Sequence, residues 1–158
     1  MKIVKKILIV LLIVLVIAQF FGPDKNESDL EDIKLFLTET NPPKDVLAIL
    51  ETTCYDCHSS NTTYPWYNKI TPVNYWLDSH IEEGKEHFNM SDWNSYSLKK
   101  KDHKLDELIE EVEEGEMPLN SYTYTHGDAN LTPEQIKKVT EWAKNVRAFY
   151  SIQMEVPQ

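Results

Sequence analysis

Two cysteines and a histidine stand close together in the run Cys54-Tyr55-Asp56-Cys57-His58, which has the pattern C-x-x-C-H. Two thiols at this spacing can reach the two vinyl groups of one haem and form thioethers, and the histidine that follows can supply a nitrogen ligand to the iron. The chain has 2 cysteines, and both lie in this motif. The motif therefore predicts one haem c, attached covalently through Cys54 and Cys57, with His58 as an iron ligand.

A cysteine pair at this spacing has other known uses. A C-x-x-C pair outside the cytoplasm could form a structural disulfide or a thioredoxin-like redox pair. A thioredoxin-like protein needs strands alternating with helices, and the chain shows no convincing strand pattern. A zinc site needs at least one more ligand, and the other four histidines form no second metal-binding pair. Covalent haem is the preferred interpretation, and a haem-free module with a Cys54–Cys57 disulfide stays open as an alternative.

The second axial ligand of the iron has three candidates. Met117, followed by Pro118, lies past a predicted helix end, and a thioether ligand raises the reduction potential of the iron, which suits electron transfer. Proline would stiffen this loop. The competing interpretation of Met117 is a simple core residue. His80, on the apolar face of a predicted helix, and His126, in the same connection as Met117, rank second and third as ligands or pocket residues.

An aromatic cluster follows the C-x-x-C-H motif as Tyr64-Pro65-Trp66-Tyr67. So many rings in one loop favour packing against a flat apolar partner, either the haem or the domain core. Tyr64 and Trp66 are therefore candidate cofactor-binding residues.

The elements that must position these residues are predicted to be helices. Proline and glycine punctuate segments whose apolar residues recur with helical spacing. The predicted helices cover 28–37, 41–54, 72–84, a segment around 105–112 that stops at Gly115, and a last helix from Pro133 that buries Ile136, Val139, Trp142, Val146 and Phe149. Thr132 and Gln135 form a capping box before the last helix. The fold class is therefore all-α.

The N-terminus reads as a membrane segment. Lys2, Lys5 and Lys6 precede an apolar run from Ile7 to Phe21, which is typical of a secretory signal or a retained anchor. The run is near the lower limit for spanning a bilayer, and no clear cleavage site precedes Gly22. We predict an anchor at 1–22, a tether at 23–27 and a haem-binding domain at 28–158. The lysines favour a single-pass inner-membrane protein with a periplasmic domain, and cleavage of the segment stays open.

The charge balance restricts the possible partners. The chain has 16 basic and 26 acidic residues and a formal net charge of −10. Such a surface does not bind nucleic acid through phosphate contacts. It is well solvated and can steer toward basic protein surfaces.

The whole pattern resembles a known family, the small bacterial haem-binding domain proteins with an N-terminal membrane segment. The resemblance covers nearly the whole chain. Its most specific parts are the C-x-x-C-H motif with Ser59, the 64–67 cluster, the stretch 72–84, Gly115-Glu116-Met117-Pro118 and Leu131-Thr132. The order of parts is also similar to class I cytochromes c, and this resemblance implies a small cytochrome c-like helical domain. The resemblance implies covalent haem c and a periplasmic location, and it implies no substrate.

These observations predict an electron carrier more than an enzyme. Its iron would be ligated by His58 and Met117, and its partners would be redox proteins such as membrane oxidoreductases. The alternative is a haem-based sensor or peroxidase-like module with an open iron position, in which His80 or His126 acts in the distal pocket.

Overall fold

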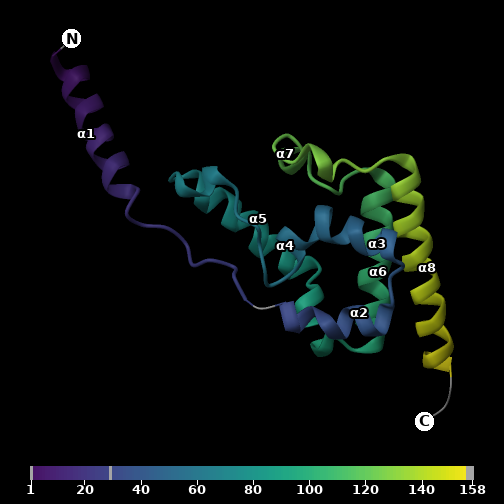
Figure 1. Cartoon of the computed structure of the whole chain (residues 1–158). Coiled ribbons are helices and arrows are strands. Elements are labelled where there is room, and N and C mark those ends of the chain that lie inside the picture. The colour runs from purple at the N-terminus through teal and green to yellow at the C-terminus, as the bar shows by residue number, and fades with distance from the viewer. Residues whose placement is uncertain (1, 29, 156–158) are drawn as a thin grey trace.

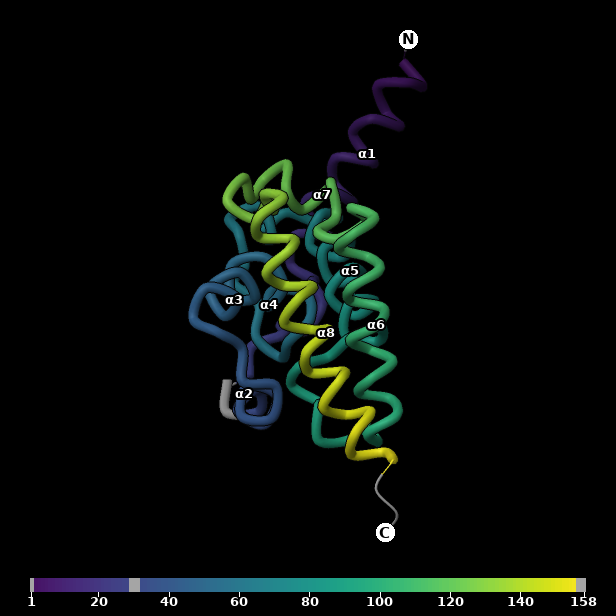
Figure 2. The backbone as a smooth tube through the Cα atoms, turned by 90° about the vertical axis from the view of Figure 1, so that its right-hand side faces the viewer, coloured from purple at the N-terminus to yellow at the C-terminus, as the bar shows by residue number. Residues whose placement is uncertain are grey.

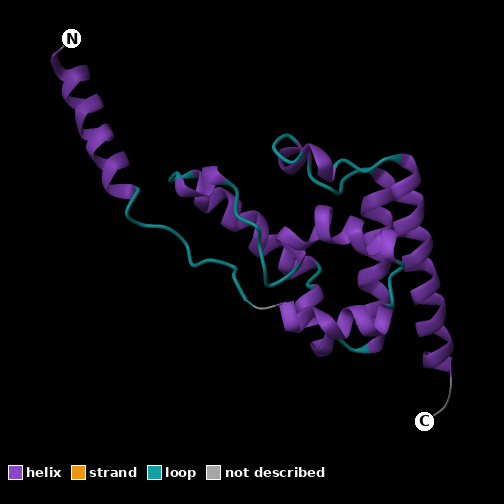
Figure 3. Cartoon of the chain, in the orientation of Figure 1, coloured by secondary structure: helices purple, strands orange, loops and turns teal. Residues whose placement is uncertain are grey.

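The computed structural model describes residues 2–28 and 30–155 of the 158-residue chain. This part of the chain is helical and contains no β-strand (Figure 3), which confirms the all-α prediction. The elements in order are α1 (Lys2–Ala18), η1 (Leu30–Ile33), α2 (Lys34–Thr40), α3 (Lys44–Ile49), η2 (Leu50–Cys54), α4 (Tyr55–His58), η3 (Trp66–Lys69), α5 (Val73–His87), η4 (Met90–Ser95), α6 (Leu98–Glu114), α7 (Asn120–Thr123), η5 (Gly127–Ala129) and α8 (Pro133–Glu155).

The two longest helices of the domain, α6 and α8, run side by side and form one wall of the molecule (Figures 1 and 2). Their apolar residues recur at helical spacing, as Leu105, Ile109 and Val112 on α6 show. Arg147 of α8 donates from Nε to Asp102 Oδ1 of α6 at 2.9 Å, which adds a polar tie beside the apolar seam. Helix α3 packs against α8, so the wall closes one side of the core.

Local signals set the ends of these two helices. Gly115 follows α6 with a positive φ of 77°, the left-handed conformation that glycine adopts most easily. The backbone N of Thr132 donates to Gln135 Oε1 at 2.9 Å, and the backbone N of Gln135 donates to the Thr132 hydroxyl at 3.3 Å. This is the predicted capping box, and α8 begins at Pro133 beside it. Both predicted ends are confirmed.

An aromatic cluster fills the centre of the core. Phe36 meets Trp93 edge to face at 5.0 Å between ring centroids, and Phe88 and Trp142 each lie 6.1 Å from Phe36. The indole of Trp142 donates to the Thr40 carbonyl at 2.9 Å. Trp93 is fully buried although it lies in the short helix η4, which the sequence did not predict.

The buried faces of two helices differ from their predicted register. On α8, Phe149 is 52% exposed, whereas Tyr150 is fully buried and donates to Glu39 Oε1 at 2.6 Å. Tyr150 follows buried Val146 by four residues, so it continues the inner stripe and Phe149 leaves it. On α5, the sequence predicts an apolar stripe of Val73, Trp76, Leu77 and Ile81. Leu77 and Ile81 are buried as predicted, but Trp76 is 48% exposed and Asn74 is buried as well.

The N-terminal helix differs from the predicted anchor. Its 17 residues span about 25 Å at 1.5 Å per residue, short of the roughly 30 Å of a bilayer core. Within residues 2–28 and 30–155, no helix combines the length and the apolar character that crossing a membrane requires. The prediction of a single-pass N-terminal anchor, with the localisation drawn from it, is therefore wrong.

The segment after α1 binds to the helical domain. The Gln19 side chain pairs with the backbone of Thr71, donating to its carbonyl at 3.1 Å and accepting from its N–H at 3.0 Å. Asn26, within the predicted 23–27 tether, donates from Nδ2 to the Ser59 carbonyl at 2.8 Å and to the Thr62 hydroxyl at 2.9 Å. The bonds of Asn26 join the segment to the loop just after His58, and those of Gln19 join it to the start of α5.

Candidate haem-binding site

The C-x-x-C-H motif lies on a helical turn that follows an irregular one. The π-helix η2 ends at Cys54, and α4 begins at Tyr55. Extra-wide helical turns of this kind are frequent at functional sites. The side chains of Cys54, Cys57 and His58 stand three and four residues apart, so one face of the turn presents all of them. Both thiols are free.

The orientation of His58 is set by the backbone at the end of α5. Its Nδ1 lies 2.8 Å from the Phe88 carbonyl oxygen, which can only accept, so Nδ1 carries the proton. Burial lowers the pKa of His58, and the carbonyls of Phe88 and Gly84 offset part of that effect. The imidazole is therefore neutral with Nε2 unprotonated, which is the form that ligates a metal ion.

The motif opens onto a cavity of about 500 Å³, within the roughly 300–1,000 Å³ typical of cofactor pockets. Its walls come from the motif, α5, α6 and the connection that follows α6. Apolar side chains make up part of the lining, from Phe88, Leu108, Val112, Pro118 and Leu119. Of the predicted site residues, the cavity brings together Cys54, Cys57, His58, His80 and Met117.

Helix α5 approaches the motif closely at Gly84. A Cβ atom at this position would lie 2.8 Å from the Cys57 carbonyl oxygen and 3.1 Å from the Cys57 Cβ. Real Cβ atoms do not come so near to backbone oxygen, so only glycine fits. The glycine was predicted to end its helix, yet α5 continues to His87. Its role is close packing against the cysteine motif.

Met117 reaches the cavity because α6 ends at Glu114, three residues before it. The backbone N–H groups of Glu116 and Met117 both donate to the Glu111 carbonyl at 3.0 Å, which closes the helix end around Gly115. Met117 is half-buried and lies outside the hydrophobic core cluster. Its position is that of a pocket residue.

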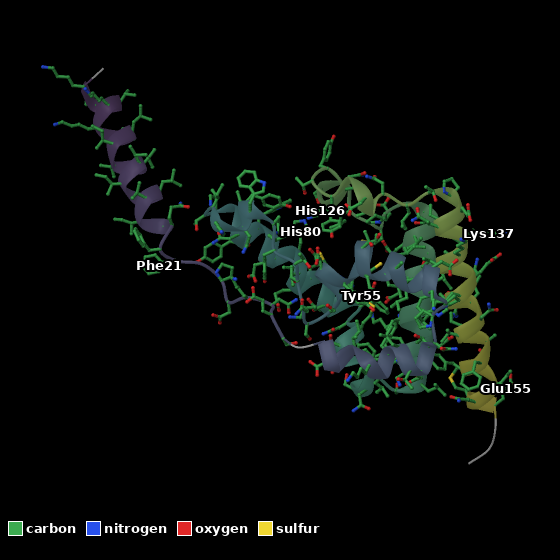
Figure 4. All side chains as sticks on the ribbon, viewed as in Figure 1. Phe21, Tyr55, His80, His126, Lys137 and Glu155 are labelled. Carbon is green, nitrogen blue, oxygen red and sulfur yellow. The ribbon has the colours of Figure 1, made fainter. Side chains whose placement is uncertain are left out.

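The two histidines ranked behind Met117 take different positions (Figure 4). His80 lines the cavity, half-buried, with Nδ1 2.8 Å from the Trp76 carbonyl and its ring 4.6 Å from the Trp76 ring. It does not point into the core as predicted, because the α5 face that carries Trp76 is partly exposed. His126 does not line the cavity and stacks on Tyr122 at 4.1 Å between ring centroids.

The structure places neither predicted aromatic residue at the cavity. The Tyr64 hydroxyl accepts from the Asn26 N–H at 2.7 Å, and Trp66 is 75% exposed with its ring against Tyr67. Sequence reasoning also missed Phe88, Gly84 and Tyr122, which touch the motif or line the cavity. An isolated glycine inside a helical pattern was the one available signal among these three.

The two thiols should react slowly in the cofactor-free protein. Burial raises the pKa of Cys54 to about 12, with a further rise from Cys57, and burial followed by the nearby Asp56 raises the pKa of Cys57 to about 11. A thiol with a pKa near 11 carries on the order of 100-fold less thiolate at pH 8 than one with a pKa near 9. Alkylation by iodoacetamide, followed by mass spectrometry, should be at least roughly tenfold slower in the folded protein than in urea, and should accelerate as the pH rises toward 11. Equal rates in both states would contradict the shielding of these half-buried thiols by the fold.

The residues around the cavity fit a haem. Two free thiols and a neutral imidazole converge on one largely apolar pocket, and a thioether lines it as well. Among the described residues, neither this cavity nor any other place contains a group of three or more His, Cys, Asp or Glu side chains that could hold a metal ion by themselves.

Comparison with known proteins agrees with this geometry. A family model described as "Haem-binding domain" matches residues 13–145, which include the motif, α5, α6 and Met117. No curated protein and no solved structure matches the chain. Because the family model covers most of the sequence, the chain belongs to the haem-binding domain family.

Proposed function

We propose that this protein is an electron carrier with one haem c, attached through Cys54 and Cys57 and ligated by His58 and Met117 in a cytochrome c-like arrangement. The observation that carries the proposal is the convergence of both free thiols, the neutral imidazole and the thioether on one cavity. Membership in the haem-binding domain family supports the cofactor itself.

Each group has a distinct task in this proposal. Haem iron supplies one-electron chemistry when bound. The Phe88 carbonyl holds the His58 tautomer, so that Nε2 is the ligating atom. The Met117 thioether is a soft, neutral donor that favours the reduced metal, and apolar Leu108 and Val112 line the same cavity. Redox proteins with basic surfaces are the expected partners, because the chain has a net charge of −10.

A second candidate function is a haem-based sensor or peroxidase-like module. The observation that favours it is His80, which lines the cavity and donates from Nδ1 to the Trp76 carbonyl, leaving Nε2 available. Such a histidine could hold a bound ligand if the iron position opposite His58 were open. Rapid carbon monoxide binding to the reduced wild-type protein would favour this candidate, and inertness favours the electron carrier.

The proposed cofactor attachment is tested with the full chain expressed in a host that matures c-type cytochromes. We expect a band that stains for haem on a denaturing gel and a pyridine haemochrome spectrum of the c type. A colourless band would overturn the proposal and leave a disulfide-containing module as the leading account.

Replacing Met117 with alanine tests the second ligand. The variant should keep its covalent haem, lose the charge-transfer absorption of a methionine-bound ferric haem, and bind carbon monoxide faster. Its reduction potential should fall by a sizeable part of the roughly 0.8 V range that axial ligation spans. Met154→Ala is the matched control, since Met154 is 44% exposed near the end of α8. An unchanged spectrum in Met117→Ala would remove Met117 from the ligand set.

A further inference from the structure

The connection between α6 and α8 contains the short helix α7 (Figure 1). It contributes Met117, Pro118, Leu119 and Tyr122 to the lining of the cavity. Within the described residues, two side-chain hydrogen bonds join residues 118–131 of this connection to the rest of the domain. The Tyr122 hydroxyl donates to Asp56 Oδ2 at 2.8 Å, and the hydroxyls of Tyr67 and Thr125 lie 2.9 Å apart. The first of these bonds ends inside the C-x-x-C-H motif.

Asp56 is a firmly held acceptor for this bond. It stands between Cys54 and Cys57, and its Oδ1 accepts from the Thr63 N–H at 2.8 Å. Its carbonyl oxygen also accepts from the Thr62 hydroxyl at 2.6 Å. The carboxylate therefore has a defined direction, and its second oxygen is left for Tyr122.

Tyr122 is an equally well-placed donor. Its ring lines the cavity and stacks on His126 at 4.1 Å with an interplanar angle of 16°. Its backbone N–H donates to the Leu119 carbonyl at 3.0 Å, in the turn that follows Met117 and Pro118. Burial, and then the bond to Asp56, raises the pKa of Tyr122, so the phenol stays protonated and remains a donor.

We propose that the Tyr122–Asp56 hydrogen bond is a latch that positions Met117 over the cavity, with Tyr122 and Asp56 as positioning residues. The latch rests on the proposed function, because it concerns the same pair of ligands. One carboxylate within the motif that carries His58 holds the connection that carries Met117, so the latch fixes the separation of the two ligands. A closed latch keeps the thioether in place and excludes competing small ligands from the iron.

Tyr122→Phe in the full chain with attached haem is the direct test, because it keeps the stacked ring and removes only the hydroxyl. Covalent haem content should stay unchanged, and the methionine–iron charge-transfer absorption should weaken. Carbon monoxide should bind the reduced variant roughly tenfold faster, the size expected from losing one hydrogen bond to a charged group. Hydrogen–deuterium exchange across residues 117–127 should accelerate, with or without bound haem.

Four further variants separate the latch from general damage to the connection. Tyr124→Phe is the matched control, since Tyr124 is 90% exposed, and it should behave as wild type. Asp56→Asn keeps an acceptor for the Thr63 N–H and offers an amide to the Tyr122 oxygen, so it should restore part of the wild-type behaviour that Asp56→Ala loses. The double variant Tyr122→Phe/Asp56→Ala should be no worse than the more affected single variant, as expected for two partners in one interaction.

The outcomes distinguish the latch from the proposed function. If Met117→Ala loses the charge-transfer absorption but Tyr122→Phe keeps wild-type absorption, carbon monoxide binding and exchange, the latch is overturned and the electron carrier stands. If the haem-loaded wild type lacks that absorption, Met117 ligation and the latch both fall, while covalent attachment stands.

Discussion

Replacing Cys54 and Cys57 together with alanine is expected to abolish all haem that survives denaturation. The expected loss is complete because no other cysteine exists in the chain to form a thioether. Single replacement should leave one covalent bond, with haem still on the denatured chain and an altered pyridine haemochrome spectrum. A denaturing gel stained for haem, read beside that spectrum, measures both effects.

The double variant should still bind haem weakly, since the contact between His58 and the Phe88 carbonyl does not involve either thiol. That haem should be extractable into acidified organic solvent, which separates loss of attachment from loss of the pocket. Thr52→Ala, an exposed position two residues before Cys54, is the matched control and should stain as wild type. Haem that stays on the denatured double variant would contradict the proposed attachment.

Features encoded within a few residues were predictable from the sequence. The end of α6 at Gly115 and the start of α8 at Thr132 and Pro133 depend on glycine conformation and on a capping box, each complete within four residues. The C-x-x-C-H motif is local in the same sense, because its chemistry requires only the residue types and their spacing.

Features decided by packing partners were not predictable in detail. Helical periodicity leaves the buried stripe uncertain by one residue, and the neighbouring Glu39 decides that Tyr150 is inside and Phe149 outside. Trp93 lies in the short helix η4, where too few residues exist to show a period. Its burial follows from the aromatic residues around it, above all Phe36.

The N-terminal segment shows how composition alone misleads. The apolar run continues to Phe21, but α1 ends at Ala18. The Gln19 side chain then binds the backbone of Thr71, 52 positions away. Hydropathy counts apolar residues and does not locate the helix end, so the predicted span was longer than the helix that forms.

The site was predictable where it is local and unpredictable where distant segments meet. Met117 could be identified from the residues next to it, because it follows a predicted helix end at Gly115 and precedes Pro118. The Phe88 carbonyl lies 30 positions from His58, and Tyr122 lies 66 positions from Asp56. Nothing in a single sequence links residues so far apart, so both contacts required the structure.

Gly84→Ala is expected to lower the free energy of unfolding, although helix propensity alone predicts that this substitution raises it. In an ordinary helix interior this change stabilises by about 0.5–1 kcal/mol. Here the new Cβ would stand 2.8 Å from the Cys57 carbonyl oxygen, so α5 and the motif must separate. Overpacking of this kind costs about 1–3 kcal/mol, and we expect the free energy of unfolding in urea to fall by that amount.

The same substitution should also reduce haem attachment, which ties the packing to the function. Moving the motif away from α5 would lengthen the 2.8 Å contact between His58 Nδ1 and the Phe88 carbonyl and release the imidazole from its defined orientation. Gly127→Ala is the matched control, because no atom lies within 4 Å of its added Cβ, and its stability should stay within about 0.5 kcal/mol of wild type. If Gly84→Ala were as stable as wild type and fully loaded with haem, the close approach of α5 to Cys57 would have no part in holding the site.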